Sequence, residues 1–519
     1  MTKLRINQQE LDVPSDITVL EAALAAGFEI PTMCNNGEVE HFASCMVCVV
    51  KDLRNGSYLP SCSTGVQEGM DLLTEGEELT EARKTALDLL LSEHVGDCEA
   101  PCRIACPAFM DIPEMNRLIA TGKAEEAYLK VTKDIALPGI LGRICPAPCE
   151  SVCRRKSVDS AVSICLLKRF TADTTVHLIE KTPLRFTQKV AVVGAGPAGL
   201  AAAYYLQIKG IQSTVFDSNK LPGGALRYVL SEEQLDKAML DLEIDRIIQT
   251  GVLFELDHLI DKHLFERLCK DFDAVVLATG NFHETISDWG IEHDGKHLHA
   301  DKTSHRTNLP KVFAIGNTTR SSKMAIRSAA QGKEVAVSIE QLFSGEAVIG
   351  EKRRFNSSFG KLLQSEVFEY LKESTDRERQ SDGVHSKEGF SREEAMLEAE
   401  RCLHCDCRKT DHCILRDLSD RYRAAQGRYG HGERLPVVKK IAKDHLIYEP
   451  GKCIKCGICV RMTAKYQETF GFTFIGRGFQ VEVGAPFDET MASALAKTMA
   501  VVCEACPTGA LSSLIPTDK

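Results

Sequence analysis

The sequence predicts a multidomain protein that combines α/β and α+β folds, because it joins a nucleotide-binding pattern to several groups of cysteines. In residues 189–217 a buried strand, three glycines, an apolar helix, a second strand and an acid follow one another. Of the 21 cysteines, all except Cys269 lie in runs before or after the domain that this stretch begins. A chain of 519 residues is long enough for several domains, each with its own core.

The glycine-rich turn has the residue order that binds a dinucleotide. Residues 190–193 are predicted as a buried strand, 200–208 as an apolar helix and 213–216 as a second strand. The glycines allow a tight turn, close approach of a pyrophosphate to the backbone and packing of the helix on the strand. The alternative is a glycine-rich turn in an ordinary α/β unit. The expected binding residues are Gly194, Gly196, Pro197, Ala198, Gly199 and Asp217, the last as an acceptor for a ribose.

Charge and composition exclude several function classes. The net charge of −10 predicts no nucleic-acid footprint, and no apolar run reaches the length of a membrane span. The N-terminus MTKLRINQQELDV lacks a signal-peptide pattern, so we expect a cytoplasmic protein. In a reducing compartment, tight groups of cysteines indicate metal or redox chemistry rather than disulfides, which here means zinc or iron–sulfur clusters.

Residues 1–78 are predicted to hold the first cluster. Residues 3–7 and 10–13 suggest a hairpin, and a helix is expected over 19–26 with Ser15 or Asp16 near its start. Four cysteines follow with C-x10-C-x2-C-x13-C spacing, three on a loop and one on a later strand. This arrangement suits a [2Fe–2S] cluster, with structural zinc as the alternative. The expected ligands are Cys34, Cys45, Cys48 and Cys62.

With TVLEAALAAGFEIPTMC before these cysteines and EARKTALDLLLSEH after them, the first 95 residues resemble the N-terminal ferredoxin domain of the complex I large iron–sulfur subunit. Iron-only hydrogenases and diaphorase subunits carry similar domains. The resemblance implies a β-grasp ferredoxin fold. A helix over 79–93, with apolar residues on one face, is expected to lead to the next domain.

A second group of cysteines occupies a predicted helical domain, residues 79–175, with a helical stretch over 112–131. The CxxxCP motif with a following DIP, the phrase LGRICPAPCE and the LKRF helix resemble the two-cluster domain of the glutamate synthase small subunit and dihydropyrimidine dehydrogenase. That resemblance implies two [4Fe–4S] clusters with interleaved ligands. Cys98, Cys102 and Cys153 would share one cluster, and Cys106, Cys145 and Cys149 the other.

Each of these two clusters then needs a fourth ligand. His94 lies four residues before Cys98, and a His-x3-Cys start also occurs in the complex I subunit; the alternative is a surface histidine at the end of a helix. The related family uses a polar side chain near Lys168. Lysine is a poor iron ligand, and Cys165 lies one turn earlier on the same helix face, so Cys165 is favoured over a small buried core cysteine.

Residues 186–345 are predicted as a Rossmann-like domain. The phrases LPGGALRYVL, DAVVLATG and VFAIGN, and a helix over 325–339, resemble the FAD domain of the glutamate synthase small subunit. Two departures concern the flavin face: asparagine replaces the usual aspartate at 317, and VLSEEQL replaces the GIP-x-F phrase. The resemblance adds Gly223, Gly224, Thr279, Gly280, Gly316 and Asn317 to the expected binding residues.

The largest departure from that family is an absence. The family inserts an NADPH domain between the ATG and GD phrases, but here only 35 hydrophilic residues separate Gly280 from Gly316. A nucleotide-binding βαβ unit needs about 30 residues plus packing partners. We therefore expect FAD without a pyridine-nucleotide site on this chain. The histidines of this stretch are more typical of a solvated loop than of a metal site.

The C-terminal third contains two further groups of cysteines. Residues 346–400 are predicted as a linker that ends in a helix with a Ser391–Glu394 capping box. Residues 401–445 carry a C-x2-C-x-C-x5-C run, interpreted as a [4Fe–4S] site with zinc as the alternative. The expected ligands of this run are Cys402, Cys405, Cys407 and Cys413.

Residues 446–519 resemble a ferredoxin-like domain, and their GFTFIGRGFQVEVGAPF insert is similar to one in hydrogenase and formate dehydrogenase electron-transfer subunits. Thr463 replaces the fourth cysteine of the first run, which argues against a second cluster. Cys503 is an alternative to Cys506 as the last ligand of the one expected cluster. The expected ligands are Cys453, Cys456, Cys459 and Cys506.

Together these patterns predict one FAD, one [2Fe–2S] cluster and up to four [4Fe–4S] clusters, with no catalytic side chain of the protein's own. We expect an electron-transfer subunit of a cytoplasmic oxidoreductase complex linked to NADH, hydrogen, formate or ferredoxin. Its expected partners are an NADH-oxidising flavoprotein of the complex I type and a hydrogenase or formate dehydrogenase subunit. The alternatives are a glutamate synthase small-subunit-like reductase that uses NAD(P)H and a cluster scaffold with an empty flavin domain.

Overall fold

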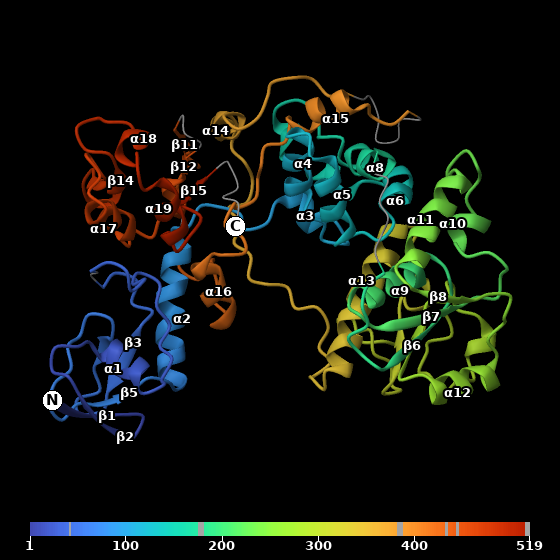
Figure 1. Cartoon of the computed structure of the whole chain (residues 1–519), viewed down its shortest axis with the longest axis horizontal. Coiled ribbons are helices and arrows are strands. Elements are labelled where there is room, and N and C mark those ends of the chain that lie inside the picture. Colours follow the sequence, from blue (N-terminus) through green and yellow to red (C-terminus); the bar gives the residue numbers. More distant parts are fainter. Residues whose placement is uncertain (41–42, 175–180, 381–387, 431–433, 443–445, 514–519) are drawn as a thin grey trace. The chain divides into compact units, whose positions relative to one another are not determined.

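The computed structural model describes residues 1–519 except 41–42, 175–180, 381–387, 431–433, 443–445 and 514–519. The chain forms two compact units (Figure 1). Unit 1 comprises residues 1–100, 354–373 and 405–519, and unit 2 comprises 101–353 and 374–404. This division differs from the six consecutive segments expected from the sequence. One boundary falls inside the cysteine run 402–413, because tertiary packing joins segments that lie far apart in the chain.

Unit 1 begins with a five-stranded mixed sheet of order β2-β1-β5-β3-β4, in which only β1 and β5 are parallel. One helix, α1, packs against it. Alternating burial along β1 directs Leu4 and Ile6 into the core with residues of α1. The elements are β1 (Thr2–Ile6), β2 (Gln9–Val13), α1 (Val19–Ala25), β3 (Val49–Asp52), β4 (Tyr58–Pro60) and β5 (Asp71–Leu73).

The hairpin and the first helix lie where the sequence predicts them, but the helix cap differs. Thr18 is the N-cap residue, and it forms a capping box with Glu21. Ser15 and Asp16, one of which the sequence places near the helix start, precede this cap. Ser15 instead accepts a hydrogen bond from Thr2, at 2.9 Å between the two hydroxyl oxygens. The physical reason is spacing, because a capping box needs the acid three residues after the cap.

The remainder of unit 1 packs around the long helix α2 (Glu77–Ser92). Its buried Leu87 and Leu91 share a core with Leu415 of α16 and Tyr448 of β12. Strands β11, β12 and β15 form a small antiparallel sheet, and β13 pairs with β14. The elements are α14 (Val367–Leu371), α16 (Ile414–Arg421), β11 (Lys440–Ile441), β12 (Leu446–Tyr448), α17 (Ile458–Lys465), β13 (Thr473–Ile475), β14 (Glu482–Gly484), α18 (Met491–Ala494), α19 (Met499–Ala505) and β15 (Leu511–Ser513).

Unit 2 begins with a helical subdomain. The helical stretch expected over 112–131 is present and consists of two helices, because the chain turns at Gly122 with a φ of +76°. Residues 374–404, part of which was expected as a linker, belong to this unit, and α15 packs against α4 and α8. The elements are α3 (Pro101–Ala105), α4 (Ile112–Ala120), α5 (Ala124–Thr132), α6 (Pro138–Ile144), α7 (Pro148–Ser151), α8 (Ile164–Thr174) and α15 (Arg392–Ala399).

The second part of unit 2 is a parallel sheet of order β10-β9-β6-β7-β8 with helices on both faces. Alternate residues of β6 enter two different cores: Val190 and Val192 pack with α9 and α13, and Ala191 and Val193 pack with α12. The elements are β6 (Lys189–Val193), α9 (Pro197–Ile208), β7 (Gln212–Phe216), α10 (Ala225–Tyr228), α11 (Lys237–Gln249), β8 (Leu253–Glu255), α12 (Lys262–Asp271), β9 (Ala274–Leu277), β10 (Val312–Ala314) and α13 (Ala325–Phe343).

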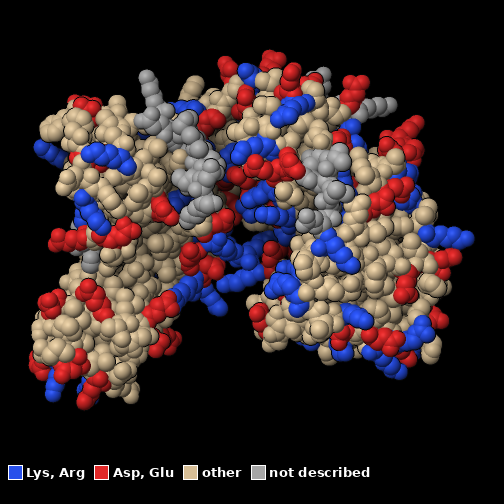
Figure 2. Space-filling model, in the orientation of Figure 1, with Lys and Arg blue, Asp and Glu red and all other residues tan. Residues whose placement is uncertain are grey.

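The surface carries both signs of charge. In Figure 2 acidic and basic side chains are interspersed over the visible face of each unit. Among the described helices, none combines the length and the apolar character that crossing a bilayer requires.

Candidate cofactor sites

The dinucleotide turn joins β6 to α9, and its glycines are required by close backbone approaches. Gly194 has a φ of +110° and lies against the Ala278 carbonyl, where a Cβ atom would overlap. A Cβ on Gly224 would lie 2.7 Å from the Cα of Gly196. Asp217, at the end of β7, accepts a hydrogen bond from the Ala195 backbone N–H at 2.7 Å. The two halves of the turn are therefore held together by groups that a larger side chain would separate.

A cavity of 470 Å³ opens at this turn. Gly199 and Gly223 do not line it; Gly199 packs α9 on Gly194, and Gly223 donates to the Ala195 carbonyl at 2.8 Å. The sequence-predicted residues that do line it are Gly194, Gly196, Pro197, Ala198, Asp217, Gly224, Thr279, Gly280, Gly316 and Asn317. A mostly apolar cavity with a few polar groups over a glycine-rich turn fits a dinucleotide.

Trp289 is a lining residue that the sequence reasoning missed. Its ring stacks on Phe265 at 4.5 Å between centroids, and its indole nitrogen is buried without a hydrogen-bond partner in the described part of the chain. A buried donor without a partner is unusual in a folded protein and suits a site that a polar ligand completes. Only the amino-acid composition could have drawn attention to this residue, because Trp289 is the single tryptophan in the sequence.

The stretch between Gly280 and Gly316 folds back onto the sheet domain rather than forming a second nucleotide cradle in its described residues. Ile286, Trp289 and Ile291 enter the same core as α12. The histidines here bond separate partners: His305 contacts Glu334 at 3.0 Å, and His297 contacts Ser321 at 3.0 Å. His305 is buried, so the stretch is not solvated along its whole length.

The four cysteines predicted for the [2Fe–2S] cluster lie together in unit 1. All four are buried, and the thiols of Cys45 and Cys62 lower the pKa of Cys34. The thiol of Cys62 lowers the pKa of Cys48 to about 6. Three of them come from the loop between α1 and β3. Cys62 lies in the turn after β4, not on a strand as expected.

A second set of thiols gathers in unit 2, and we name it the Cys165 group: Cys106, Cys145, Cys149 and Cys165. The thiol of Cys165 hydrogen-bonds that of Cys145, which lowers its pKa, and that of Cys149, which together with burial raises the pKa to about 12. The ammonium of Lys168 lies 3.9 Å from the sulfur of Cys165. The structure thus brings Cys165 to the three cysteines with which the sequence paired it.

Cys153 lies near Cys402. Burial is the main cause that raises the pKa of the Cys153 thiol, and the charge of Cys402 adds to it. Helix α3, which carries Cys102, packs against α7, which precedes Cys153. We name Cys102, Cys153 and Cys402 the Cys402 group. All three belong to unit 2, although about 300 residues of sequence separate the first from the last.

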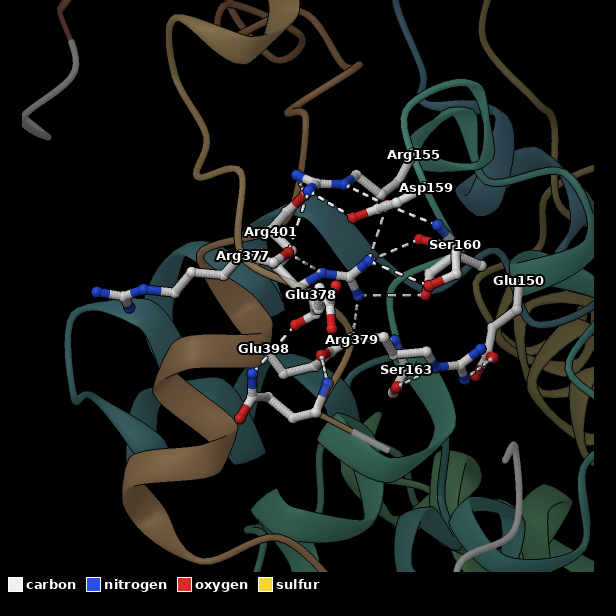
Figure 3. A network of polar contacts seen from close by, with 12 residues as sticks. Glu150, Arg155, Asp159, Ser160, Ser163, Arg377, Glu378, Arg379, Glu398 and Arg401 are labelled. Carbon is white, nitrogen blue, oxygen red and sulfur yellow. Dashed lines mark hydrogen bonds and ion pairs between the residues drawn. The ribbon is translucent and has the colours of Figure 1, made fainter. Parts of the chain in front are cut away.

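A buried ionic network fixes Cys402 in unit 2 (Figure 3). Arg401 is fully buried and pairs with Glu398 at 2.7 Å and with Asp159 at 2.9 Å. Arg155, also fully buried, pairs with the same Asp159 at 2.7 Å and donates to the Arg401 carbonyl at 3.2 Å. Because Arg401 precedes Cys402 and Arg155 follows Cys153 by two residues, the network holds both cysteine backbones in place.

The later cysteines of the same run lie in unit 1 beside Cys98. The backbone N–H of Cys407 donates to the Cys98 carbonyl at 3.1 Å, and the charges of Cys407 and Cys98 contribute, after burial, to raising the pKa of Cys413 to about 12. We name Cys98, Cys407 and Cys413 the Cys413 group. Cys402 and Cys153 thus belong to unit 2, and Cys98, Cys407 and Cys413 belong to unit 1.

His94, in the same unit, is partly buried rather than a fully exposed surface residue. Burial and the neighbouring Lys452 lower its pKa to about 4, so the imidazole is neutral at pH 7. Its buried Nδ1 atom has no partner among the described residues. A neutral imidazole is the protonation state that binds metals.

The last set, the Cys506 group, encloses a small cavity lined by Cys453, Cys456, Cys459 and Cys506. Cys503 does not line this cavity, and its carbonyl accepts a hydrogen bond from Lys409 at 2.8 Å. Thr463 donates to the Val460 carbonyl and accepts from the Phe472 N–H, both within its own unit. The described residues hold no set of side chains spaced for a single metal ion, whereas a cluster of several irons holds its thiolates farther apart.

Four family models match separate parts of the chain, and they support the expected iron–sulfur and Rossmann-like modules. The 2Fe-2S iron-sulfur cluster binding domain matches residues 1–77, and the dihydropyrimidine dehydrogenase domain II, 4Fe-4S cluster, matches 81–178. The NAD(P)-binding Rossmann-like domain matches 192–247, and the ferredoxin-like domain of NADH-quinone oxidoreductase subunit 3 matches 446–512. The chain is a mixed α/β multidomain protein with ferredoxin-like domains and a Rossmann-like domain.

Curated relatives are oxidoreductases or subunits of oxidoreductase complexes. The NADPH-Fe(3+) oxidoreductase subunit beta of Geobacter sulfurreducens is 38% identical over 35% of this chain and 28% of its own length. The NADP(+)-dependent formate dehydrogenase subunit beta of Moorella thermoacetica is 36% identical over 35% of this chain and 29% of its own length. The glutamate synthase [NADPH] small chain of Bacillus subtilis is 36% identical over 36% of this chain and 40% of its own length. The matches thus span less than half the length of these relatives.

Among solved structures, that of an NAD+-reducing [NiFe]-hydrogenase in the H2-reduced state is 35% identical to this chain. The match covers 18% of this chain and 39% of that chain, with a TM-score of 0.17. It is a similarity over one short stretch.

Proposed function

We propose that this chain is an electron-transfer subunit that carries electrons between partner proteins through FAD and iron–sulfur clusters. The observation that carries the proposal is a shared core. Val190 and Ala198 of the dinucleotide turn and Cys145 and Cys165 of the Cys165 group belong to one continuous hydrophobic core in unit 2. Such a core keeps a bound flavin and a bound cluster at a fixed separation, which an electron carrier requires.

We further propose FAD as the dinucleotide, one [2Fe–2S] cluster and four [4Fe–4S] clusters. Cys34, Cys45, Cys48 and Cys62 would hold the [2Fe–2S] cluster, and the Cys165 and Cys506 groups would each hold one [4Fe–4S] cluster. The other two would be held by the Cys402 group and by the Cys413 group with His94. The buried neutral imidazole of His94 supports the last assignment. This proposal replaces the single cluster that the sequence predicted for residues 402–413.

The division of that run can be tested with two single variants. C402S and C413S should each lose the iron of one cluster, with different electron paramagnetic resonance signals missing, and the double variant should lose both. A single shared cluster would instead give the same missing signal in all three proteins. C269S is the matched control, because Cys269 lies in the sheet domain away from the groups and should keep all of the iron.

The names of two relatives suggest which partners this chain has. The beta subunits of an NADPH-Fe(3+) oxidoreductase and of a formate dehydrogenase support an assembly with a nucleotide-oxidising subunit and a catalytic subunit. We propose an NADH-oxidising flavoprotein as donor or acceptor on one side, and a hydrogenase or formate dehydrogenase subunit, or ferredoxin, on the other. A cytoplasmic location remains a prediction from the sequence.

The decisive experiment is stopped-flow reduction of the purified holoprotein. NADH or NADPH alone should leave the flavin oxidised. When the flavoprotein partner is added together with NADH, the flavin and the clusters should become reduced. Rapid reduction by NADPH alone would contradict the proposal. It would favour the second candidate, a reductase like the glutamate synthase small chain, which the 36% identity to that relative supports.

The identity of the dinucleotide has a separate test. Because Trp289 is the only tryptophan and lines the cavity, FAD added to the flavin-free protein should quench tryptophan fluorescence with saturation. W289F keeps the aromatic stack on Phe265 and loses the indole N–H, so it should bind FAD more weakly, with binding followed by flavin fluorescence. Absence of FAD in the supernatant after acid precipitation of the native protein would favour the scaffold with an empty flavin domain.

A further inference from the structure

Lys168 buries an ammonium in the middle of the Cys165 group. The side chain comes from α8, one turn after Cys165, and only 3% of the residue is exposed. Its Nζ atom lies 3.9 Å from the Cys165 sulfur. The thiols of Cys145 and Cys149 hydrogen-bond that of Cys165, so the ammonium lies beside a connected set of sulfur atoms. The charge of Lys168 therefore acts on the same sulfur atoms that would bind the cluster.

No carboxylate forms an ion pair with Lys168 in the described part of the chain. The nearest candidate is Glu150, whose two oxygens are already occupied. One accepts the Cys165 backbone N–H at 3.0 Å, and the other pairs with Arg379 at 3.0 Å. A buried ammonium without a counter-charge costs several kcal/mol, so an anion is needed among the thiols. Four iron-bound thiolates would supply one.

We propose that Lys168 is a positioning residue that raises the reduction potential of the cluster held by the Cys165 group. The inference rests on the proposed function, since it requires that cluster. Reduction adds one negative charge to the cluster, and a nearby buried cation stabilises the reduced form more than the oxidised form. Lys168 is not an iron ligand, because Cys165 already provides the fourth thiol of the group.

The test is a redox titration of the holoprotein followed by electron paramagnetic resonance, with iron content measured in parallel. K168M should retain all iron, and the equilibrium constant for reduction of this one cluster should fall at least tenfold, which is about 59 mV for a one-electron couple. K133M is the matched control. It makes the same lysine-to-methionine change at Lys133, an exposed position of the same subdomain. Its titration curve should match that of the wild type.

Three results would overturn the inference. Loss of one cluster's iron in a folded K168M would identify Lys168 as a ligand. An unchanged potential in K168M, with iron retained, would show that the ammonium does not act on the cluster. Wild-type protein without iron at the Cys165 group would overturn the proposed function as well. If K168M does not fold, K168Q, which keeps a polar head group without the charge, is expected to give the same shift.

Discussion

Lys452 in unit 1 and Lys168 in unit 2 both bury an ammonium beside cysteines, but they are neutralised differently. Lys452 pairs with Glu449 at 2.5 Å while its side chain lies near Cys407. Lys168 lies 3.9 Å from the sulfur of Cys165, and no described carboxylate forms an ion pair with it. Unit 1 can therefore balance its buried lysine with amino acids alone, whereas unit 2 needs deprotonated, metal-bound sulfur to do so. We expect the two sites to respond in opposite ways when a cofactor or a carboxylate is removed.

The largest expected effect is at Lys452. E449Q leaves the ammonium buried without its carboxylate and should destabilise unit 1 by about 3–5 kcal/mol. Denaturant unfolding followed by circular dichroism measures the loss. E482Q is the control, because Glu482 forms a more exposed pair with Lys440 and should cost less than about 1 kcal/mol. Equal effects of the two variants would mean that burial of the pair does not matter.

Glu243 extends the comparison to a buried acid. Its carboxylate accepts the N–H groups of Gly139 and Ile140 at 2.7 and 2.8 Å, and its nearest cation, Arg246, lies 4.0 Å away. Burial raises its pKa to about 7. The folded state therefore binds this proton more tightly than the unfolded state, whose pKa is near 4.5.

Stability from Glu243 is thus fully present below about pH 4.5 and is lost as the pH rises through 7, by about 3 kcal/mol in total. E243Q should remove this dependence. Melting temperature measured from pH 4.5 to 8 checks it, as the difference between the wild type and the variant. E233Q, at an exposed acid of the same domain, should keep the wild-type slope. A wild-type-like slope in E243Q would assign the pH dependence to other groups.

Removal of iron should make the K168M variant more stable than the wild type. In the iron-free protein the thiols are protonated at neutral pH, so Lys168 has no counter-charge. Iron-free K168M should then be more stable than iron-free wild type by about 2 kcal/mol. Unfolding of both proteins after chelation measures the difference. If the wild type is the more stable of the two without iron, the thiols alone compensate the ammonium.

The smallest effect is expected at the side chain of Arg377, whose backbone carbonyl accepts a hydrogen bond from Arg401 in the network of Figure 3. Arg377 pairs with Glu400 at 2.7 Å on the surface, with about half of its side chain exposed. R377M should cost less than about 1 kcal/mol, because solvent screens such a pair. R401M in the same network removes a fully buried cation and provides the contrast. Thermal unfolding of both variants, together with retained iron, separates the exposed pair from the buried one.

Several features follow from local sequence alone. The hairpin of β1 and β2 and the helix α1 form at nearly the predicted positions, and the Ser391–Glu394 capping box is present as expected. The glycines of the dinucleotide turn and the four cysteines of the first 78 residues come together because each set lies on one short stretch. In these places the ligand and its supporting strand or helix are neighbours in the chain, so spacing carries the information.

Tertiary structure decided the rest. Cys402, Cys405, Cys407 and Cys413 are close in sequence, yet the neighbouring Arg401 pairs with Asp159 in unit 2, while the Cys407 backbone hydrogen-bonds that of Cys98 in unit 1. Likewise, Trp289 reaches the dinucleotide cavity only because its segment folds back onto α12. Buried ion pairs and packing between distant segments choose such partners, and neither leaves a periodic pattern in the sequence. The amino-acid sequence alone therefore determined which modules and cofactor types to expect, and the folded chain determined which cysteines pack together within each unit.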